Sequence, residues 1–340
     1  MTERFVNTLS FSHVQRKRLA FPSPMPPSSV AESRPAVRPF LKWAGGKRQL
    51  LRELRRFVPA AIGAYHEPFL GSGALFFDLW KTGTLGGNRC YLADANADLI
   101  GVYRAVAHDA DSVIEELRKL SALHAREGAA AYYQVRDRRF NPQRRTRVPD
   151  RGILYPPVLA AMFIYLNRTG YNGLFRLNSS GDFNVPAGRY RKPNICDEPT
   201  LRSVAAILGS GQVSLEVQSF TEIDRTAATG DLVYFDPPYA PLSATARFTS
   251  YTAGAFSDED QRTLKDIVIG LARRGCSVIV SNSTAPSVCA LYESAEAREA
   301  GLDAYRIPAR RAINSKATRR GTVDEFVISN VRPVDVGAHP

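Results

Sequence analysis

Beyond residue 39, the apolar and polar positions of the chain follow two alternating patterns. Short apolar runs, typical of buried strands, are followed by stretches with the spacing of amphipathic helices. The runs predict strands at residues 65–70, 88–93, 214–219, 232–235, 276–281, 303–307 and 324–329. The helical spacing predicts helices at residues 47–58, 74–81, 98–108 and 258–274. This alternation is typical of an α/β fold with a doubly wound, Rossmann-like sheet, and the last two strands fit an added antiparallel hairpin.

Two segments depart from this alternation. Residues 1–37 are rich in proline and serine, with few large apolar side chains, which predicts a disordered basic tail in which Met25 is an alternative start. Between residues 109 and 200, charged helical segments at 112–126 and 129–139 give way to loops rich in Asn, Gly, Arg and Tyr. Such side chains hydrogen-bond to base edges or stack on bases. We therefore predict a mainly helical target-recognition domain at 109–200, inserted into a catalytic domain formed by residues 38–108 and 201–335.

The charge of the chain indicates a polyanionic partner. Its formal net charge is +12, and arginine is concentrated rather than spread. The densest cluster comprises Arg136, Arg138, Arg139, Arg144, Arg145, Arg147 and Arg151. A second comprises Arg306, Arg310, Arg311, Lys316, Arg319 and Arg320. A solvated basic surface is the alternative. If the partner is nucleic acid, such arginines contact phosphates and give affinity without sequence information.

Composition also limits where the protein acts. No apolar stretch approaches the ~20 residues of a membrane span, and the N-terminus lacks the apolar region of a secretory signal. The cysteines Cys90, Cys196, Cys276 and Cys289 have no metal-ligand or redox spacing, so we expect them to be reduced and mostly buried. We expect a cytoplasmic, nucleoid-associated monomer that has no membrane contact and no metal.

A four-residue motif closes the strand predicted at 232–235. It consists of Asp236, Pro237, Pro238 and Tyr239. Because proline fixes φ and has no N–H, the turn can direct carbonyl oxygens outward. A carboxylate and a carbonyl can then accept the two hydrogens of an exocyclic amine, while the tyrosine stacks on the attached ring, as in a site for an extruded base. A proline-rich turn with a capping aspartate is the alternative, and the motif alone does not decide between the two.

The segment 67–73 places glycines directly after the first predicted strand. Gly71 and Gly73 allow a ligand to approach the backbone closely, within a loop that also contains Glu67 and Phe69. Asp94 ends the next strand, where a carboxylate suits a ribose hydroxyl. Because no third glycine follows at the usual spacing, the pattern favours S-adenosylmethionine over a dinucleotide. A tight turn and a helix N-cap remain the alternatives for the glycines and for Asp94.

A third motif, at residues 40–47, precedes the first predicted helix. It contains Lys42, Trp43, a glycine pair and Lys47. A glycine pair at a helix start exposes backbone N–H groups, which suit the carboxylate of an amino-acid-like ligand. A helix-capping loop around a buried Trp43 is the alternative.

The order of these motifs resembles the DNA adenine methylase (Dam) family, the α-group of adenine-specific DNA methyltransferases. The resemblance runs from residue 40 to residue 330. Its longest stretches are residues 165–168, 170–174, 183–186, 188–190 and 236–246, and the late segments 310–315 and 323–325 match more loosely.

The resemblance implies roles for individual residues. Trp43, Lys47, Asp94 and Asp236 fall where the family binds S-adenosylmethionine or the target base, and residues 67–73 form the cofactor loop. The implied DNA-binding residues are Lys42, Tyr171, Asn172, Leu174, Arg176 and Pro186. The implied target is GATC in double-stranded DNA, with Tyr171 as a wedge in the duplex and Arg176 reading a guanine. A loop aromatic packed in the core and a phosphate clamp are the respective alternatives.

The predicted reaction is direct methyl transfer from S-adenosylmethionine to the amine of a flipped adenine. Asp236, rather than serine or asparagine, favours adenine over cytosine, RNA or a protein amide. Two other functions remain open: an amino-methyltransferase acting on another DNA site within a restriction–modification system, and a catalytically silent DNA-binding regulator. The intact motif and cofactor loops argue against the silent regulator.

Overall fold

The computed structural model describes residues 37–43, 47, 49–147, 155–240, 256–310 and 322–334. Residues 1–36 of the predicted tail, the glycine pair at 45–46, and residues 311–320 of the second basic cluster lie outside the described residues. Val37, which the sequence assigned to the tail, is buried in the core. No helix among the described ranges is long and apolar enough to cross a membrane.

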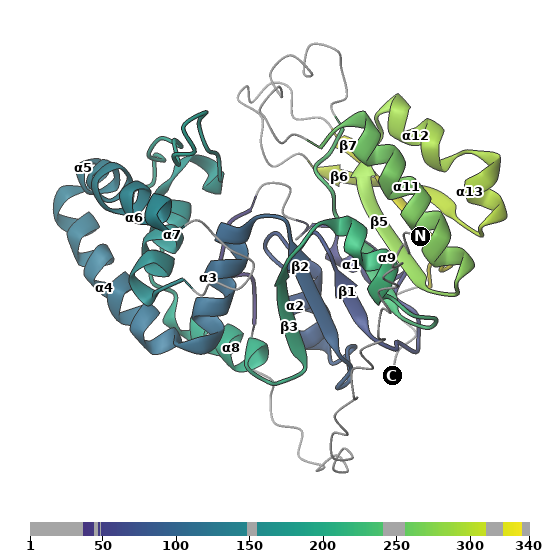
Figure 1. Cartoon of the computed structure of the whole chain (residues 1–340), viewed down its shortest axis with the longest axis horizontal. Coiled ribbons are helices and arrows are strands. Elements are labelled where there is room, and N and C mark those ends of the chain that lie inside the picture. Colours follow the sequence, from purple (N-terminus) through teal and green to yellow (C-terminus); the bar gives the residue numbers. More distant parts are fainter. Residues whose placement is uncertain are drawn as a thin grey trace, which may run out of the picture. The chain divides into compact units, whose positions relative to one another are not determined.

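A seven-stranded sheet organises the chain, with the strand order β3-β2-β1-β4-β5-β7-β6 (Figure 1). The strands are β1 (Tyr65–Glu67), β2 (Cys90–Asp94), β3 (Val213–Val217), β4 (Leu232–Phe235), β5 (Ser277–Ser283), β6 (Asp303–Arg310) and β7 (Thr322–Ser329). The first five are parallel, whereas β7 lies antiparallel between β5 and β6. This confirms the predicted doubly wound sheet with a terminal antiparallel hairpin.

The helices that connect the strands are partly those that the sequence predicts. Those before β3 are α1 (Leu51–Arg55), α2 (Ala74–Thr82), α3 (Ala97–His108), α4 (Ala110–Glu127), α5 (Ala129–Tyr133), the π-helix η1 (Gln134–Phe140), α6 (Asn141–Thr146), α7 (Pro157–Thr169), the 3₁₀ turn η2 (Tyr171–Gly173) and α8 (Glu198–Leu208). Those after β3 are the 3₁₀ turn η3 (Phe220–Glu222), α9 (Ile223–Thr226), α11 (Asp258–Arg273), α12 (Pro286–Tyr292) and α13 (Ala295–Glu299).

The sequence prediction lacks six of the described helices, α6, α7, α8, α9, α12 and α13, of which α7 and α8 are the longest. Most of α7 is buried, from Leu159 to Asn167, so it lacks the polar face that reveals helical periodicity. Helix α8 contains the domain boundary predicted at residue 200 and packs against α3 and α4. In contrast, α11 begins at a capping box made by Ser257 and Asp260, and its bounds nearly equal the prediction.

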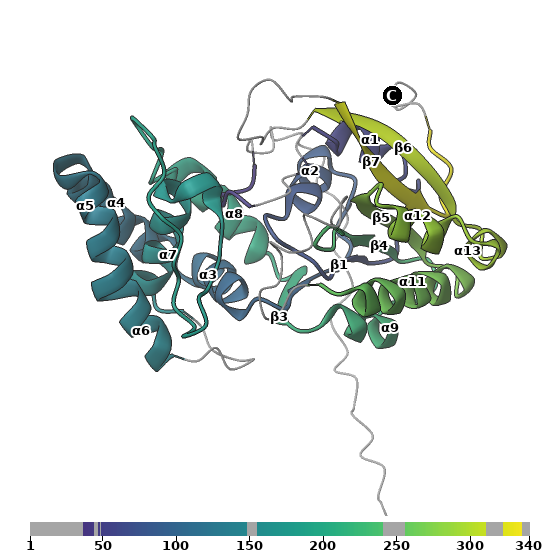
Figure 2. The ribbon, with the colours of Figure 1, turned by 90° about the horizontal axis from the view of Figure 1, so that it is seen from above.

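Alternate residues of the central strands enter different cores on the two faces of the sheet. On β4, Val233 and Phe235 belong to the cluster that includes α11, whereas Leu232 and Tyr234 belong to the cluster that includes α2. Figure 2 shows α11 and α2 on opposite sides of this strand. Because side chains alternate along a strand, four consecutive apolar residues require cover on both faces.

The order of the strands fixes where a ligand site can form. The chain passes from β1 to β2 on one side of the sheet and from β4 to β5 on the other side. The direction of the connections therefore reverses between β1 and β4. The two strands pair in parallel, with Tyr65 opposite Leu232, so their carboxyl ends lie at one edge of the sheet. Doubly wound sheets bind ligands at such a reversal. Glu67 ends β1 and Asp236 follows β4 at this edge.

A long hairpin follows α7 within the segment predicted to recognise DNA. Its ends are joined by a bridge between Gly170 and Ala187, and its tip by a bridge between Leu177 and Phe183. The buried Asn167 fastens its base to the N-terminal segment. The Asn167 side chain accepts from the Lys42 N–H (2.8 Å) and donates to the carbonyls of Lys42 (2.7 Å) and Gly173 (3.1 Å).

The first arginine cluster does not form one free phosphate-binding surface. Arg144 makes two 2.7 Å hydrogen bonds to the Asp98 carboxylate, with only 12% and 5% of the two side chains exposed. Arg145 pairs with Asp182. The exposed Arg138 has no partner among the residues that the structure describes. The expected phosphate role is therefore wrong for Arg144, which fastens α6 to α3.

The buried pair predicts effects of very different size for two arginines of one cluster. Arg144→Ala should lower the free energy of unfolding by about 3–5 kcal/mol, because it leaves the Asp98 carboxylate buried without its cation. Arg138→Ala should change it by less than about 0.5 kcal/mol, since its side chain is exposed. Urea unfolding of both variants tests this difference. Equal stability of the two variants would contradict the structural role of Arg144.

Candidate active site

The loop that leaves β4 is held by three side chains from α11 and β5. Gln261 donates to the carbonyl of Pro238 (3.3 Å), and Asn282 donates to the Gln261 side chain (3.0 Å). The hydroxyl of Ser283 donates to the carbonyl of Ala240 (2.8 Å). The sequence motif identified the loop but not these supports, because they are contacts between distant segments.

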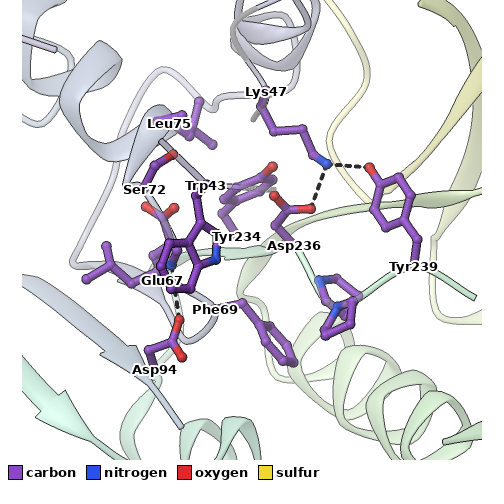
Figure 3. Close-up of a pocket in the computed structure, with 15 residues that line it drawn as sticks. Trp43, Lys47, Glu67, Phe69, Ser72, Leu75, Asp94, Tyr234, Asp236 and Tyr239 are labelled. Carbon is purple, nitrogen blue, oxygen red and sulfur yellow. Dashed lines mark hydrogen bonds and ion pairs between the residues drawn. The ribbon is translucent and has the colours of Figure 1, made fainter. Parts of the chain in front are cut away.

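Lys47 lies between the acidic and aromatic residues of this loop (Figure 3). Its Nζ is 2.8 Å from Asp236 Oδ1 and donates to the Tyr239 hydroxyl at 2.5 Å. Only 4% of the Lys47 side chain is exposed. Burial raises the pKa of Asp236, and the nearby ammonium opposes this rise. Lys47 thus favours the ionised carboxylate in a poorly solvated site.

The glycine loop after β1 is held by Asp94 at the end of β2. The Asp94 carboxylate accepts the Gly71 N–H (3.0 Å) through Oδ2 and the Asn96 N–H (2.9 Å) through Oδ1. Gly71 has a φ of 49°, and a Cβ there would lie 2.9 Å from Trp43 Cδ1. Glycine is therefore required for both backbone conformation and space. Asn96, not Asp94, caps α3.

Glu67 is a buried carboxyl at the end of β1. Burial raises its pKa to about 8, the nearby Asp236 carboxylate adds to the rise, and a hydrogen bond from the Tyr65 hydroxyl (2.8 Å) opposes it. A pKa of about 8 favours the protonated form of Glu67 at neutral pH, beside the Asp236 carboxyl, whose own pKa is raised by burial and lowered by Lys47.

These groups surround one cavity of about 580 Å³. Its lining comprises Trp43, Lys47, Glu67, Phe69, Leu70, Gly71, Ser72, Ala74, Leu75, Asp94, Tyr234, Asp236, Pro237, Pro238 and Tyr239. Carboxyl groups beside aromatic rings suit a ligand with positive charge and an aromatic base, and the volume is that of a small-molecule site. All predicted catalytic and cofactor residues line it except Gly73, which caps α2 with a φ of 64°.

Some lining residues were missed by the sequence predictions. Leu70, Ser72, Ala74 and Leu75 belong to the predicted loop and helix, but nothing in their identity sets them apart. Tyr234 is different, because strand alternation places it on the same face as Asp236. That alternation was a signal that could have identified it.

The predicted DNA-binding residues have unequal exposure. Tyr171 is 48% exposed, and its N–H donates to the carbonyl of the exposed Pro186 (2.9 Å). Asn172 adopts a φ of 53°, a conformation that asparagine tolerates. Arg176 is exposed, and its Nε donates to Asn184 Oδ1 (2.8 Å).

Lys42 and Leu174 are less exposed than Tyr171 and Arg176. The Lys42 ammonium donates to the Arg168 carbonyl (3.1 Å) and lies 3.9 Å from the centre of the Tyr190 ring. Burial lowers its pKa, as does the Arg168 charge. Leu174 packs against the hydrophobic core rather than projecting from the hairpin. Lys42 and Leu174 are therefore half-buried, whereas Tyr171 and Arg176 are exposed.

The cysteines and metal-ligating side chains form no further site in the described ranges. Cys90 and Cys276 are buried, Cys196 and Cys289 are half-buried, and all four are free. The expectation of mostly buried cysteines is thus met by two of them. No group of three or more His, Cys, Asp or Glu residues in the same ranges has a metal-binding arrangement.

The chain is similar in sequence to a known protein family and to several known proteins. The family described as D12 class N6 adenine-specific DNA methyltransferase matches residues 43–311. The chain is 36% identical over 297 residues to the type II methyltransferase M1.LlaDCHI of Lactococcus lactis subsp. cremoris, covering 86% of this chain and 95% of that protein. It is 37% identical over 305 residues to the type II methyltransferase M.MjaIII of Methanocaldococcus jannaschii, covering 86% and 99%. It is 37% identical over 290 residues to the DNA adenine methylase of Escherichia coli K12, covering 85% and 94%.

The raised pKa of Glu67 predicts how stability depends on pH. Between its ordinary pKa of 4.5 and the folded-state value of about 8, the folded protein retains a proton that the unfolded chain releases. This contribution is fully present below the unfolded pKa and is lost as pH rises through the folded pKa. Glu67→Gln removes the titration, so the unfolding free energy of the wild type should fall more steeply with pH, by up to about 1.4 kcal/mol per unit. Urea unfolding across this range tests it, and parallel pH curves would contradict it.

Proposed function

The chain belongs to the D12 class of N6 adenine-specific DNA methyltransferases, and from this premise we propose that it methylates a flipped adenine in duplex DNA within GATC, with S-adenosylmethionine as methyl donor. The predicted family and enzyme class are confirmed by the family match and by relatives of 36–37% identity. One observation carries the finer proposal. The loop from Asp236 to Tyr239 and the loop from Glu67 to Gly71 line the same cavity.

The proposed cofactor site is the part of the cavity around the glycine loop. Bound S-adenosylmethionine supplies a methyl group on a sulfonium sulfur, which is also the leaving group. Trp43 and Phe69 offer aromatic surface there, and the carboxyl groups of Glu67 and Asp94 offer acceptors. Both Asp94 oxygens accept a backbone N–H, yet each retains a lone pair for a ribose hydroxyl.

The proposed catalytic groups are those that would hold the adenine amine. Asp236 accepts one of its hydrogens and the Pro237 carbonyl, which has no donor among the described residues, accepts the other. Tyr239 stacks on the base. These acceptors draw the nitrogen lone pair out of the ring and stabilise the charge that grows on nitrogen. Fixing the nitrogen in line with the methyl group supplies the remaining acceleration.

This mechanism predicts a selective loss in Asp236 variants. Asp236→Ala should lower single-turnover methyl transfer by at least about tenfold, because a lost charge-assisted hydrogen bond is worth about 1.5–3 kcal/mol before misorientation. DNA binding, measured by fluorescence anisotropy, should remain close to wild type. Asp236→Asn keeps the shape of the side chain but loses its charge, so its methyl transfer should also be slower. Asp324→Ala removes an exposed charge and should leave the rate of methyl transfer unchanged. Wild-type turnover in Asp236→Ala would rule out the mechanism.

The proposed recognition element is the hairpin at residues 170–187. Tyr171 is exposed and could wedge into the duplex at its base. Asn184 holds the Nε of Arg176 and leaves both terminal nitrogens of the guanidinium for a guanine O6 and N7. As proposed, residues 109–200 read the DNA, whereas 38–108 and 201–335 hold the cofactor, in a monomer acting on the nucleoid in the cytoplasm.

Arg176 and Arg138 should respond differently if this assignment is correct. Arg176→Ala should cost about 1–3 kcal/mol of discrimination at one base position and relax the recognised site. Arg138→Ala should weaken binding to all sequences and flatten the dependence of log K on log salt by about one unit. Methylation of GATC and its single-base variants at fixed salt tests Arg176→Ala, and DNA binding over a range of salt concentrations tests Arg138→Ala. A uniform loss of rate in Arg176→Ala would identify this residue as a phosphate clamp instead.

A second candidate concerns the biological setting rather than the chemistry. Two of the similar proteins are named type II methyltransferases, so a role within a restriction–modification system is also consistent with the chain. The same substrate series separates the target sites. Preference for a duplex without GATC would favour another recognised site.

A further inference from the structure

The hydrogen-bond chain that begins at Asp236 continues beyond the cavity to the terminal hairpin. Lys47 Nζ contacts Asp236 Oδ1 at 2.8 Å and donates to the Tyr239 hydroxyl at 2.5 Å. The Tyr239 hydroxyl donates in turn to the carboxylate of Glu325 on β7. Glu325 does not line the cavity and belongs to none of the motifs assigned to catalysis or cofactor binding.

The pairing of β7 with β5 places Glu325 beside the catalytic loop. In this register Glu325 lies opposite Ser283, whose hydroxyl holds the Ala240 carbonyl at 2.8 Å. The next residue on β7, Phe326, points into the opposite core, so strand alternation directs Glu325 to the face that carries Tyr234. Neighbouring positions of two antiparallel strands thus hold the loop at Tyr239 and at Ala240.

The direction of these hydrogen bonds gives Glu325 a definite effect. A tyrosine hydroxyl has one hydrogen, and donating it to Glu325 leaves the oxygen lone pairs for Lys47. Lys47 then has two acceptors, Tyr239 and Asp236, for an ammonium whose side chain is only 4% exposed. Without Glu325 the Tyr239 hydroxyl loses its acceptor. The Tyr239 ring, which lies beside the proposed site of the adenine amine, is then no longer held by this hydrogen bond.

We propose that Glu325 is a positioning residue for methyl transfer, which sets Tyr239 and Lys47 against Asp236 by accepting the Tyr239 hydroxyl. The inference rests on the proposed catalytic roles of Asp236 and Tyr239. Because Glu325 acts through the loop and not on a ligand, it affects the transfer step rather than affinity for cofactor or DNA.

Three variants separate this role from a general effect on the fold. Glu325→Ala removes the acceptor, Glu325→Gln keeps an oxygen acceptor without the charge, and Asp324→Ala is the matched control on the same strand. Asp324 is exposed and has no side-chain partner in the described part of the chain. Single-turnover methylation of a GATC duplex, calorimetric affinity for S-adenosylmethionine and thermal unfolding are measured for each variant.

Glu325→Ala should slow single turnover by about tenfold to a hundredfold, the effect of one lost hydrogen bond to a charged group. Glu325→Gln and Asp324→Ala should stay within about threefold of wild type, and cofactor affinity should change by less than about threefold in every variant. Without any ligand, Lys47 should become more reactive to acetylation in Glu325→Ala, as measured by mass spectrometry.

A double-mutant cycle tests the route through the hydroxyl. In a Tyr239→Phe background, Glu325→Ala should add no further loss, because the hydroxyl through which it acts is gone. Additive losses, an impaired Glu325→Gln, or an unchanged rate in Glu325→Ala would each overturn the inference. If Glu325→Ala does not fold, Glu325→Gln and Tyr239→Phe still test the role of Glu325. Impaired methyl transfer in Glu325→Gln or wild-type methyl transfer in Tyr239→Phe would overturn the inference. Activity retained in Asp236→Ala would instead overturn the proposed function, whatever Glu325 does.

Discussion

The parallel pairing of β1 with β4 is the constraint on which the site depends. Their register, with Tyr65 opposite Leu232, brings the carboxyl ends of two strands that are distant in sequence to one edge. Glu67 and Asp236 therefore reach the same cavity although they belong to different motifs. The burial of β4 on both faces keeps this pairing rigid, because neither α2 nor α11 can shift without exposing apolar side chains.

This convergence places three carboxyl groups around a poorly solvated cavity, where like charges repel strongly. The structure limits the repulsion in three ways. Asp236 is paired with Lys47, Asp94 accepts two backbone N–H groups, and burial raises the pKa of Glu67 to about 8, which favours its neutral form at pH 7. The cavity therefore attracts a cation, and the protein avoids the full desolvation free energy of three buried anions. A positively charged cofactor would complete this balance.

The sequence predicts the site better than its supports, for a physical reason. Strand periodicity and the residues Asp236–Tyr239 are local signals, and the strands and the family they indicate are confirmed. Helix α7 has no polar face, so its pattern lacks the period of an amphipathic helix. Gln261 and Glu325 reach the loop only through tertiary register, and the charge of Arg144 cannot reveal that Asp98 already binds it.

The segment around Lys42 and Trp43 connects the cavity with the hairpin at residues 170–187. Asn167 binds the Lys42 backbone on both its N–H and carbonyl groups and also holds Gly173. A Cβ at Gly173 would lie 2.4 Å from Lys42 Cβ, so the two backbones approach as closely as glycine permits. Trp43, the next residue, lines the cavity, and its ring lies 6.3 Å from that of Phe175 in the hairpin. A displacement of the hairpin base therefore displaces a wall of the cavity. The segment that contacts the glycine loop thus also sets the position of the proposed base-reading side chains.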